Sequence, residues 1–223
     1  RVGCDLVHVA MPRNATDRAN WPDHIISERL FDDNFLEERG SEEIMRILDR
    51  NKFDAVVIGP GLGRAKETAE EVHNFLNHFS EIGIPTVVDA DAIYSLPPGE
   101  WPKGLVGVAT PHAREMRMWL WDESPASALL AGTDIDEVTG LPKGVGLESR
   151  VIVRTGSVDE LHGLEGRFCR ATGGHPRMAT GGTGDLLAGT IGSLLAQGMA
   201  PWPAARLACY LMRAAGVRTA VEF

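Results

Sequence analysis

The chain has 223 residues, 43% of them hydrophobic and 24% charged, and its formal net charge is −9 because 31 Asp and Glu outnumber 22 Lys and Arg. This composition is that of a globular protein and excludes a disordered or fibrous chain. The acidic balance and the lack of any Lys/Arg run exclude the basic surface of a nucleic-acid-binding protein. No stretch of 18 apolar residues that could span a membrane is present.

The chain begins at Arg1, and Val2–Met11 already has the pattern of a strand, so we expect that the N-terminus was trimmed or processed. Three cysteines, Cys4, Cys169 and Cys209, lie far apart without metal-ligand spacing. We therefore expect them to be small buried hydrophobes in a reducing compartment, the cytoplasm. No internal repeat or linker is found, which predicts one domain over residues 1–223.

Apolar, β-rich runs alternate with helical stretches along the chain. The runs are Asp5–Met11, Ala55–Gly59, Thr86–Ala90, Leu105–Thr110 and Val151–Thr155. Their interiors are nearly continuous in Val, Ile and Ala, which is typical of strands covered on both faces. The pattern therefore predicts an α/β protein with a central, mostly parallel sheet.

A crossover helix is predicted over Ala65–Phe79, because apolar residues at helical spacing form one face of it, namely Ala65, Ala69, Val72 and Leu76. The glycine-rich stretch from Gly156 to Gly184 predicts a hairpin, with strands Glu160–Leu164 and Arg167–Ala171, followed by an ordered loop. Two consecutive helices, Asp185–Gln197 and Pro203–Val221, are predicted to end the chain.

The sharpest functional pattern is Ala179–Gly189, where glycines crowd against the start of an amphipathic helix. Glycines let backbone N–H groups approach a ligand, and a helix N-terminus offers unpaired donors and partial positive charge. This combination predicts an anion site suited to phosphate, with Asp185 at its edge. The structural alternative is that Thr183 or Asp185 only caps the helix.

Two further glycine and carboxylate groups follow predicted strands. Gly59–Gly63 is a glycine turn after the second strand, and Asp89 and Asp91 follow the third. The carboxyl edge of a parallel sheet is where ligands bind, although all of these residues could equally serve turn geometry. The chain has no G-x-x-x-x-G-K-S/T pattern, which excludes a P-loop nucleotide hydrolase.

The last two strand ends also have residues that can do chemistry. His112 and Glu115 follow the fourth strand three residues apart, and they share a helix face if Pro111 opens a helix. The fifth strand ends in Thr155, Gly156 and Ser157, small residues against which a ring or phosphate could lie. All these strand ends and the glycine-lined helix start are predicted to converge on one edge of the sheet.

In this order, the segments Gly59–Gly63, Val88–Ile93, Thr110–Glu115 and Met178–Gly189, ending in Leu194–Gly198, resemble the NAD(P)H-hydrate dehydratase family of the ribokinase-like superfamily. The resemblance extends over nearly the whole chain from about residue 3. It implies a three-layer αβα fold. It also implies a repair reaction, in which ADP or ATP phosphorylates the 6-hydroxyl of hydrated NADH or NADPH and phosphate then leaves.

The resemblance also implies roles for individual residues. Asp185 is the catalytic base, and Gly182, Thr183 and Gly184 hold the transferring phosphoryl group. Gly61, Gly63 and His112 match positions that contact the hydrated cofactor. The positions that match the adenine-nucleotide segment are Thr155, Gly156, Ser157, Val158 and Asp159. Glu115 matches a carboxylate at the metal and phosphates, and Asp89 is a second candidate ligand for Mg²⁺.

The chain departs from the family pattern at several positions. The family usually has lysine where Thr155 stands, with Arg154 one place earlier here, and glycine where Arg114 stands. The family's N-terminal glycine- and alanine-rich stretch is absent. Loss of the lysine favours the less charged donor, ADP. We expect a homo-oligomer. The alternatives are a ribokinase-like kinase for a vitamin precursor and a nucleotide sensor without catalysis.

Overall fold

The structure is a computed structural model that describes residues 2–96, 101–102, 104–120, 150–163 and 167–222. Within these ranges the strands are β1 (Val7–Met11), β2 (Ile25–Arg29), β3 (Val56–Ile58), β4 (Thr86–Val88), β5 (Gly107–Ala109), β6 (Arg150–Arg154), β7 (Asp159–His162) and β8 (Phe168–Ala171). The α-helices are α1 (Arg13–Thr16), α2 (Glu38–Arg50), α3 (Lys66–Ile82), α4 (Asp91–Ser95), α5 (Ala113–Leu120), α6 (Thr183–Ala196) and α7 (Pro201–Glu222), and Pro176–Met178 form a 3₁₀ turn, η3.

Six strands form the main sheet in the order β3-β4-β5-β6-β7-β8. The first four are parallel, with Val87 opposite Val108 and Val108 opposite Val151. Strands β7 and β8 continue the sheet as an antiparallel hairpin. The predicted mostly parallel sheet and terminal hairpin are therefore confirmed, although Leu164 lies outside the described residues.

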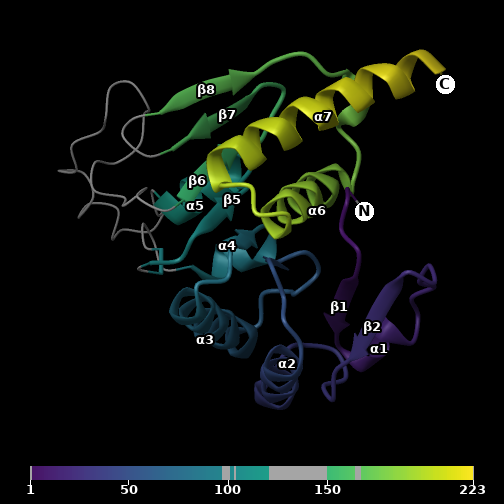
Figure 1. Cartoon of the computed structure of the whole chain (residues 1–223), viewed down its shortest axis with the longest axis vertical. Coiled ribbons are helices and arrows are strands. Elements are labelled where there is room, and N and C mark those ends of the chain that lie inside the picture. The colour runs from purple at the N-terminus through teal and green to yellow at the C-terminus, as the bar shows by residue number, and fades with distance from the viewer. Residues whose placement is uncertain (1, 97–100, 103, 121–149, 164–166, 223) are drawn as a thin grey trace.

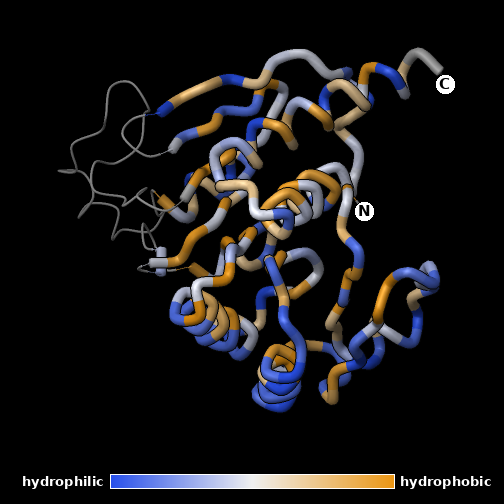
Figure 2. Tube along the Cα trace, viewed as in Figure 1, coloured by the Kyte–Doolittle hydropathy of each residue, from blue (hydrophilic) through white to orange (hydrophobic). Residues whose placement is uncertain are grey.

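Helices cover both faces of this sheet (Figure 1). Because successive side chains of a strand point to opposite faces, Val88 faces α3, α4 and α5, whereas Val87 faces α6 and α7. Each face has its own apolar core, and Figure 2 shows the hydrophobic stretches lying between the layers. The prediction of strands covered on both faces is confirmed for β4, β5 and β6. It is wrong for the edge strand β3, where Val57 is exposed.

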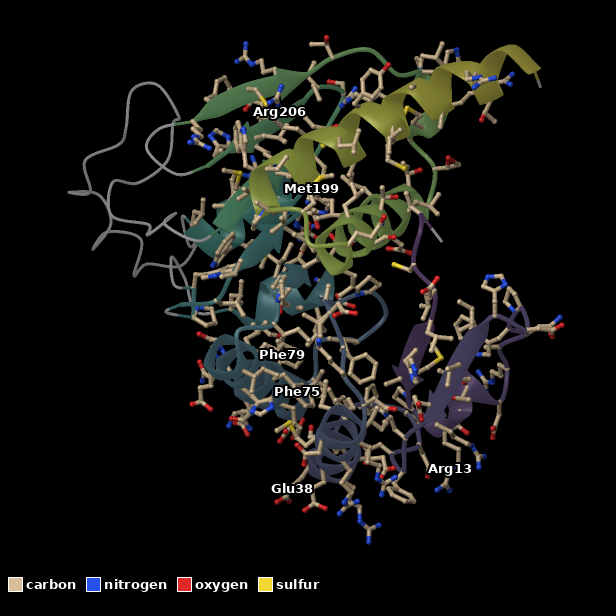
Figure 3. All side chains as sticks on the ribbon, viewed as in Figure 1. Arg13, Glu38, Phe75, Phe79, Met199 and Arg206 are labelled. Atoms are coloured by element: carbon tan, nitrogen blue, oxygen red, sulfur yellow. The ribbon has the colours of Figure 1, made fainter. Side chains whose placement is uncertain are left out.

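Helix α3 extends the predicted crossover helix to Ile82 and ends at Gly83, whose left-handed conformation (φ 71°) suits glycine. Val72 and Leu76 are buried as predicted. Phe75 and Phe79 complete the buried face, and their rings stack 5.9 Å apart (Figure 3).

The N-terminal region differs from the prediction. Strand β1 forms, but it pairs in parallel with β2 in a separate two-stranded sheet outside the six-stranded one (Figure 1). The side chains of β1 are half-buried or exposed rather than covered on both faces, so they do not suit a central strand. Strand β2 and helix α2 were not predicted, and Ile44, Met45 and Leu48 of α2 pack against the core beside α3.

None of the three cysteines, which all lie in the described part of the chain, forms a disulfide. Cys209 is buried as expected, and burial raises its pKa to about 12. Cys4 and Cys169 are only half-buried, which corrects the expectation for these two, because Cys4 lies beside Ser193 on α6 and Cys169 lies on the edge strand β8. None of the described helices is long and apolar enough to cross a bilayer.

Substitutions at two glycines of α6, Gly189 and Gly192, test how closely this helix approaches the sheet. A Cβ at Gly192 would overlap Cγ2 of Val57, whereas a Cβ at Gly189 would meet no atom within 4 Å. Alanine favours a helix over glycine by about 0.5–1 kcal/mol. We expect Gly189→Ala to raise the free energy of unfolding by that amount. Gly192→Ala should lower it by about 1–3 kcal/mol, because α6 or the Val57 side chain must shift. Urea denaturation measures both, and equal stabilities would contradict the close approach.

Candidate functional site

The turn between β3 and α3 needs glycine for two different reasons. A Cβ at Gly59 would overlap the carbonyl oxygen of Asp89, so only glycine allows this turn to lie against the end of β4. Gly61 (φ 74°) and Gly63 (φ 76°) adopt the left-handed conformation that favours glycine. A side chain at Gly61 would meet nothing within 4 Å. The turn therefore presents bare backbone to an open space.

Asp91 holds this turn in place. Its Oδ2 accepts a hydrogen bond from the N–H of Gly63 (3.1 Å), and its Oδ1 accepts one from Nε of Arg64 (3.0 Å). The Arg64 guanidinium lies 3.6 Å from the ring centroid of Tyr94. Asp91 is thus a turn residue, which was one of the two alternatives that the sequence left open.

Asp89 has a different environment at the end of β4. Its side chain is buried, and its Oδ1 accepts a hydrogen bond from the Thr110 hydroxyl (2.7 Å). Burial raises its pKa, the hydrogen bonds from Thr110 and the Ala90 N–H oppose this, and the charge of Asp185 raises the pKa further. Ala90, between the two aspartates, has a φ of 47° that alanine rarely adopts. Such backbone strain is concentrated at functional sites.

His112 and Glu115 form a reciprocal pair at the start of α5. Nδ1 of His112 accepts hydrogen bonds from the N–H groups of Arg114 (3.2 Å) and Glu115 (3.1 Å), and Oε2 of Glu115 accepts one from the N–H of His112 (2.8 Å). This is the arrangement of a capping box, with His in the place usually taken by Ser or Thr. Helix α5 begins at Ala113, as the predicted helix after Pro111 requires.

The charges of the other site residues affect the pKa of Glu115. Its side chain is buried, and burial raises its pKa. The hydrogen bond from His112 and the charges of His112 and Arg64 oppose that increase, whereas the charge of Asp89 adds to it. Asp89, His112 and Glu115 are therefore brought together as predicted, and Arg64, which the sequence did not single out, joins them.

The glycine-rich segment leads into α6, whose N-cap is Gly182 (φ 88°). Neither Thr183 nor Asp185 is therefore the N-cap residue, and the Thr183 hydroxyl instead donates to the carbonyls of Met178 (2.9 Å) and Thr180 (3.0 Å). Side chains added at Gly182 or Gly184 would meet nothing within 4 Å. Asp185 is exposed in the first turn, where an α-helix presents unpaired N–H groups.

The segment after β6 forms a tight turn. The N–H of Thr155 donates to the carbonyl of Pro111 (2.9 Å), which extends the pairing of β5 and β6 to the end of the strands. Gly156 and Ser157 are exposed. The Asp159 carboxylate lies on the inside of the turn, where it accepts from the N–H of Gly156 (3.1 Å) and from Nε of Arg213 (2.8 Å). Its carboxylate thus shapes the turn.

Arg154 is not a free cation beside this turn. Its Nε donates to Oε2 of Glu160 (3.0 Å), and Arg170 donates to the other carboxylate oxygen of Glu160 (3.1 Å). The guanidinium of Arg154 therefore lies in an ion pair on the sheet.

A magnesium ion is compatible with the two buried carboxylates. The described residues contain no group of three or more His, Cys, Asp or Glu that could hold a metal. Mg²⁺, however, is commonly held by one or two carboxylates together with phosphate oxygens and water. Asp89 and Glu115 are buried side chains whose pKa values are raised partly by nearby negative charge. A divalent cation would relieve that repulsion, so the donor set fits.

Comparisons with known proteins identify the family of the chain. A family model described as NAD(P)H-hydrate dehydratase matches residues 1–223. A bifunctional NAD(P)H-hydrate repair enzyme of Hyperthermus butylicus is 33% identical over 230 residues, which cover 100% of this chain and 40% of that enzyme. An ATP-dependent (S)-NAD(P)H-hydrate dehydratase of Sorghum bicolor is 32% identical over 104 residues, or 42% of this chain and 27% of the relative. The chain thus spans well under half the length of these curated relatives.

Solved structures support the fold. The ADP/ATP-dependent NAD(P)H-hydrate dehydratase of Bacillus subtilis, co-crystallised with ATP/Mg²⁺, aligns with a TM-score of 0.67 at 22% identity over 94% of this chain and 68% of that one. A ribokinase-like superfamily protein of Enterococcus faecalis aligns with a TM-score of 0.60 at 22% identity over 88% of this chain and 63% of that one. The predicted ribokinase-like, three-layer αβα fold is confirmed.

The ion pairs of Glu160 predict a pH dependence of stability. Arg154 and Arg170 hold the pKa of Glu160 below its ordinary value, so these pairs stabilise the fold above the ordinary carboxyl pKa of about 4.3 and lose this effect as the pH falls through the lowered pKa. We expect Glu160→Gln to lower the free energy of unfolding by about 0.2–1 kcal/mol at pH 7. The difference should shrink below about pH 4.

Urea denaturation across this pH range measures the effect. Glu81→Gln is the matched control, because Glu81 is exposed on α3 and has no ion pair in the described part of the chain. A Glu160→Gln effect that is constant with pH, or equal to that of the control, would contradict the assignment.

Proposed function

The chain belongs to the NAD(P)H-hydrate dehydratase family, and on that premise we propose that it removes water from hydrated NADH or NADPH in a reaction that consumes an adenine nucleotide. The observation that carries the proposal is the position of Asp185. It is an exposed carboxylate in the first turn of α6, beside glycines with open space around them. Its negative charge raises the pKa of the buried Asp89.

In the proposed reaction the carboxylate of Asp185 accepts the proton of the 6-hydroxyl group as the oxygen attacks the terminal phosphorus of the nucleotide. The new O–P bond replaces the bond to the leaving nucleotide. The unpaired N–H groups at the start of α6, from Gly182 to Gly184, bind the transferring phosphoryl group. Phosphate then leaves from C6 with loss of a ring proton, which regenerates the dihydronicotinamide.

The two substrates are proposed to bind at different strand ends of the same sheet edge. The bare backbone at Gly61 and Gly63, with His112, binds the hydrated cofactor. The turn of Thr155, Gly156, Ser157 and Val158 receives the nucleotide, and Asp159 shapes that turn. Asp89 and Glu115 would hold Mg²⁺, which when bound neutralises phosphate charge.

Three further expectations stay predictions: residues 1–223 form one ribokinase-like domain, the protein acts in the cytoplasm, and it forms a homo-oligomer.

Asp185→Asn tests the proposed base. Asparagine has nearly the same shape but cannot accept the hydroxyl proton, so kcat for phosphate release from hydrated NADH should fall by about 100-fold or more. The free energy of unfolding should change by less than about 0.5 kcal/mol, because Asp185 is exposed and is not the N-cap. Asp49→Asn, on an exposed carboxylate of α2, is the control. Retention of more than about a tenth of kcat would show that Asp185 is not the base.

Gly184→Ala tests the phosphate site without disturbing the fold. Position 184 lies in the helix and a Cβ there meets no atom within 4 Å, so the chain can accommodate alanine. The methyl group would occupy the space proposed for the phosphoryl group. We expect affinity for ADP and ATP in titration calorimetry to fall by about tenfold or more, with Gly189→Ala unchanged. If a folded Gly184→Ala variant binds nucleotide with undiminished affinity, the phosphoryl group does not bind at this position.

The nucleotide preference is a separate proposal. Thr155 supplies no positive charge, and Arg154 is paired with Glu160. The shorter and less charged donor should tolerate that lack better. We therefore expect a higher kcat/KM for ADP than for ATP at saturating Mg²⁺. A value for ATP equal to or above that for ADP would reverse the preference and leave the role of Asp185 untouched.

A further inference from the structure

Arg213 is a buried cation in the middle of α7. Only 7% of this arginine is exposed, although arginine is almost never buried unless it is paired. Its guanidinium donates four hydrogen bonds: from Nε to Oδ2 of Asp159 (2.8 Å), from Nη1 to the carbonyls of Ser157 (2.9 Å) and Gly173 (2.7 Å), and from Nη2 to the carbonyl of Gly156 (3.1 Å).

These bonds join two segments that are far apart in the chain. Gly156 and Ser157 belong to the turn between β6 and β7, and Gly173 begins the loop that leads from β8 to α6. Helix α7 also supports this loop at Gly216, where a Cβ would overlap the sulfur of Met178 in η3. Helix α7 thus holds both segments on which the proposed nucleotide site depends.

The bonds to carbonyls also fix the direction of N–H groups. In a planar trans peptide, the C=O of one residue and the N–H of the next point in opposite directions. Because the carbonyls of Gly156 and Ser157 point inward to Arg213, the N–H groups of Ser157 and Val158 point to the opposite side. Two successive N–H groups that point the same way are suited to binding an anion.

We propose that Arg213 is a positioning residue for the nucleotide: it does not touch the ligand, but it orients the backbone N–H groups of the turn after β6 and anchors that turn to the loop before α6. The inference rests on the proposed function, since it assumes that this turn receives the nucleotide. Asp159 neutralises the guanidinium, so the contribution of Arg213 is geometric, and it requires the planar fork that lysine lacks.

Arg213→Lys is the first test. Lysine keeps a positive charge opposite Asp159 but cannot reach three carbonyls in the same geometry. We expect the Kd for ADP and ATP in titration calorimetry, and the KM for the nucleotide, to rise by about 10- to 100-fold. The KM for hydrated NADH should stay within about threefold. Arg218→Lys, on an exposed arginine of the same helix, should change none of these values.

A second variant separates positioning from stability. The double variant Asp159→Leu/Arg213→Met replaces the buried ion pair by apolar side chains, a change that often preserves stability, but it also removes the guanidinium donor from three carbonyls. We expect it to fold, with a thermal midpoint at or above that of Arg213→Lys, and still to bind nucleotide about 10- to 100-fold more weakly than the parent.

The outcomes separate this inference from the proposed function. If the parent binds nucleotide and either variant, once folded, binds it equally well, the positioning role is wrong and the proposed function stands. An equal rise in the KM of both substrates would also overturn the positioning role, because it would indicate general loosening of the fold. If the parent binds neither ADP nor ATP, the proposed function and the inference both fail.

Discussion

Buried negative charge at the carboxyl ends of β4 and β5 is the constraint around which the site is arranged. Asp89 and Glu115 are both buried, burial raises both pKa values, and the charge of Asp89 raises that of Glu115 further. Carboxylates with raised pKa values lower the stability of the folded protein as the pH rises from the ordinary carboxyl pKa to the raised one, and the full loss is present above it. Proteins keep such destabilising groups where a ligand will use them.

The nearby cations compensate for this charge only in part, because His112 and Arg64 oppose the increase in the Glu115 pKa without cancelling it. Among the described residues around the site, Arg64 is bonded to Asp91, Arg154 to Glu160 and Arg213 to Asp159. A nucleotide would bring still more negative charge. Backbone N–H groups, at the start of α6 and in the turn after β6, together with a bound metal ion, would meet its phosphates. The glycines at these places and the two buried carboxylates are suited to those two tasks.

Much of this arrangement could be predicted from the sequence, because it depends on local patterns. Runs of Val and Ile predict the parallel strands, and residues just after those strands must meet at one edge of the sheet. That reasoning placed Asp89, His112 and Glu115 together. It could not tell that Asp91 holds the glycine turn whereas Asp89 remains buried, since both follow the same strand and differ only in tertiary contacts.

Other features were missed for physical reasons. In strand β2 only Ile25 and Glu28 are half-buried, and the other residues are exposed. The strand therefore lacks the apolar run of a central strand. Helix α2 has Gly40 and Ser41 in its first turn, which weaken its helical pattern. Arg213 resembles a solvated helix arginine. Its spacing could have indicated otherwise, because Arg213 lies four residues after Cys209 and eight after Ala205. Both of these residues are buried, so the spacing places Arg213 on the inner face of α7.

In the proposed dehydration the phosphorylated hydrate does not persist but loses phosphate. The most direct measurement follows dihydronicotinamide absorbance, free phosphate and nucleotide in one sample of the purified chain with hydrated NADH, Mg²⁺ and ADP or ATP. For a dehydratase, one dihydronicotinamide and one phosphate should appear for each nucleotide consumed. Consumption of nucleotide with accumulation of a phosphorylated hydrate, and no gain in dihydronicotinamide absorbance, would instead identify a kinase and contradict the account.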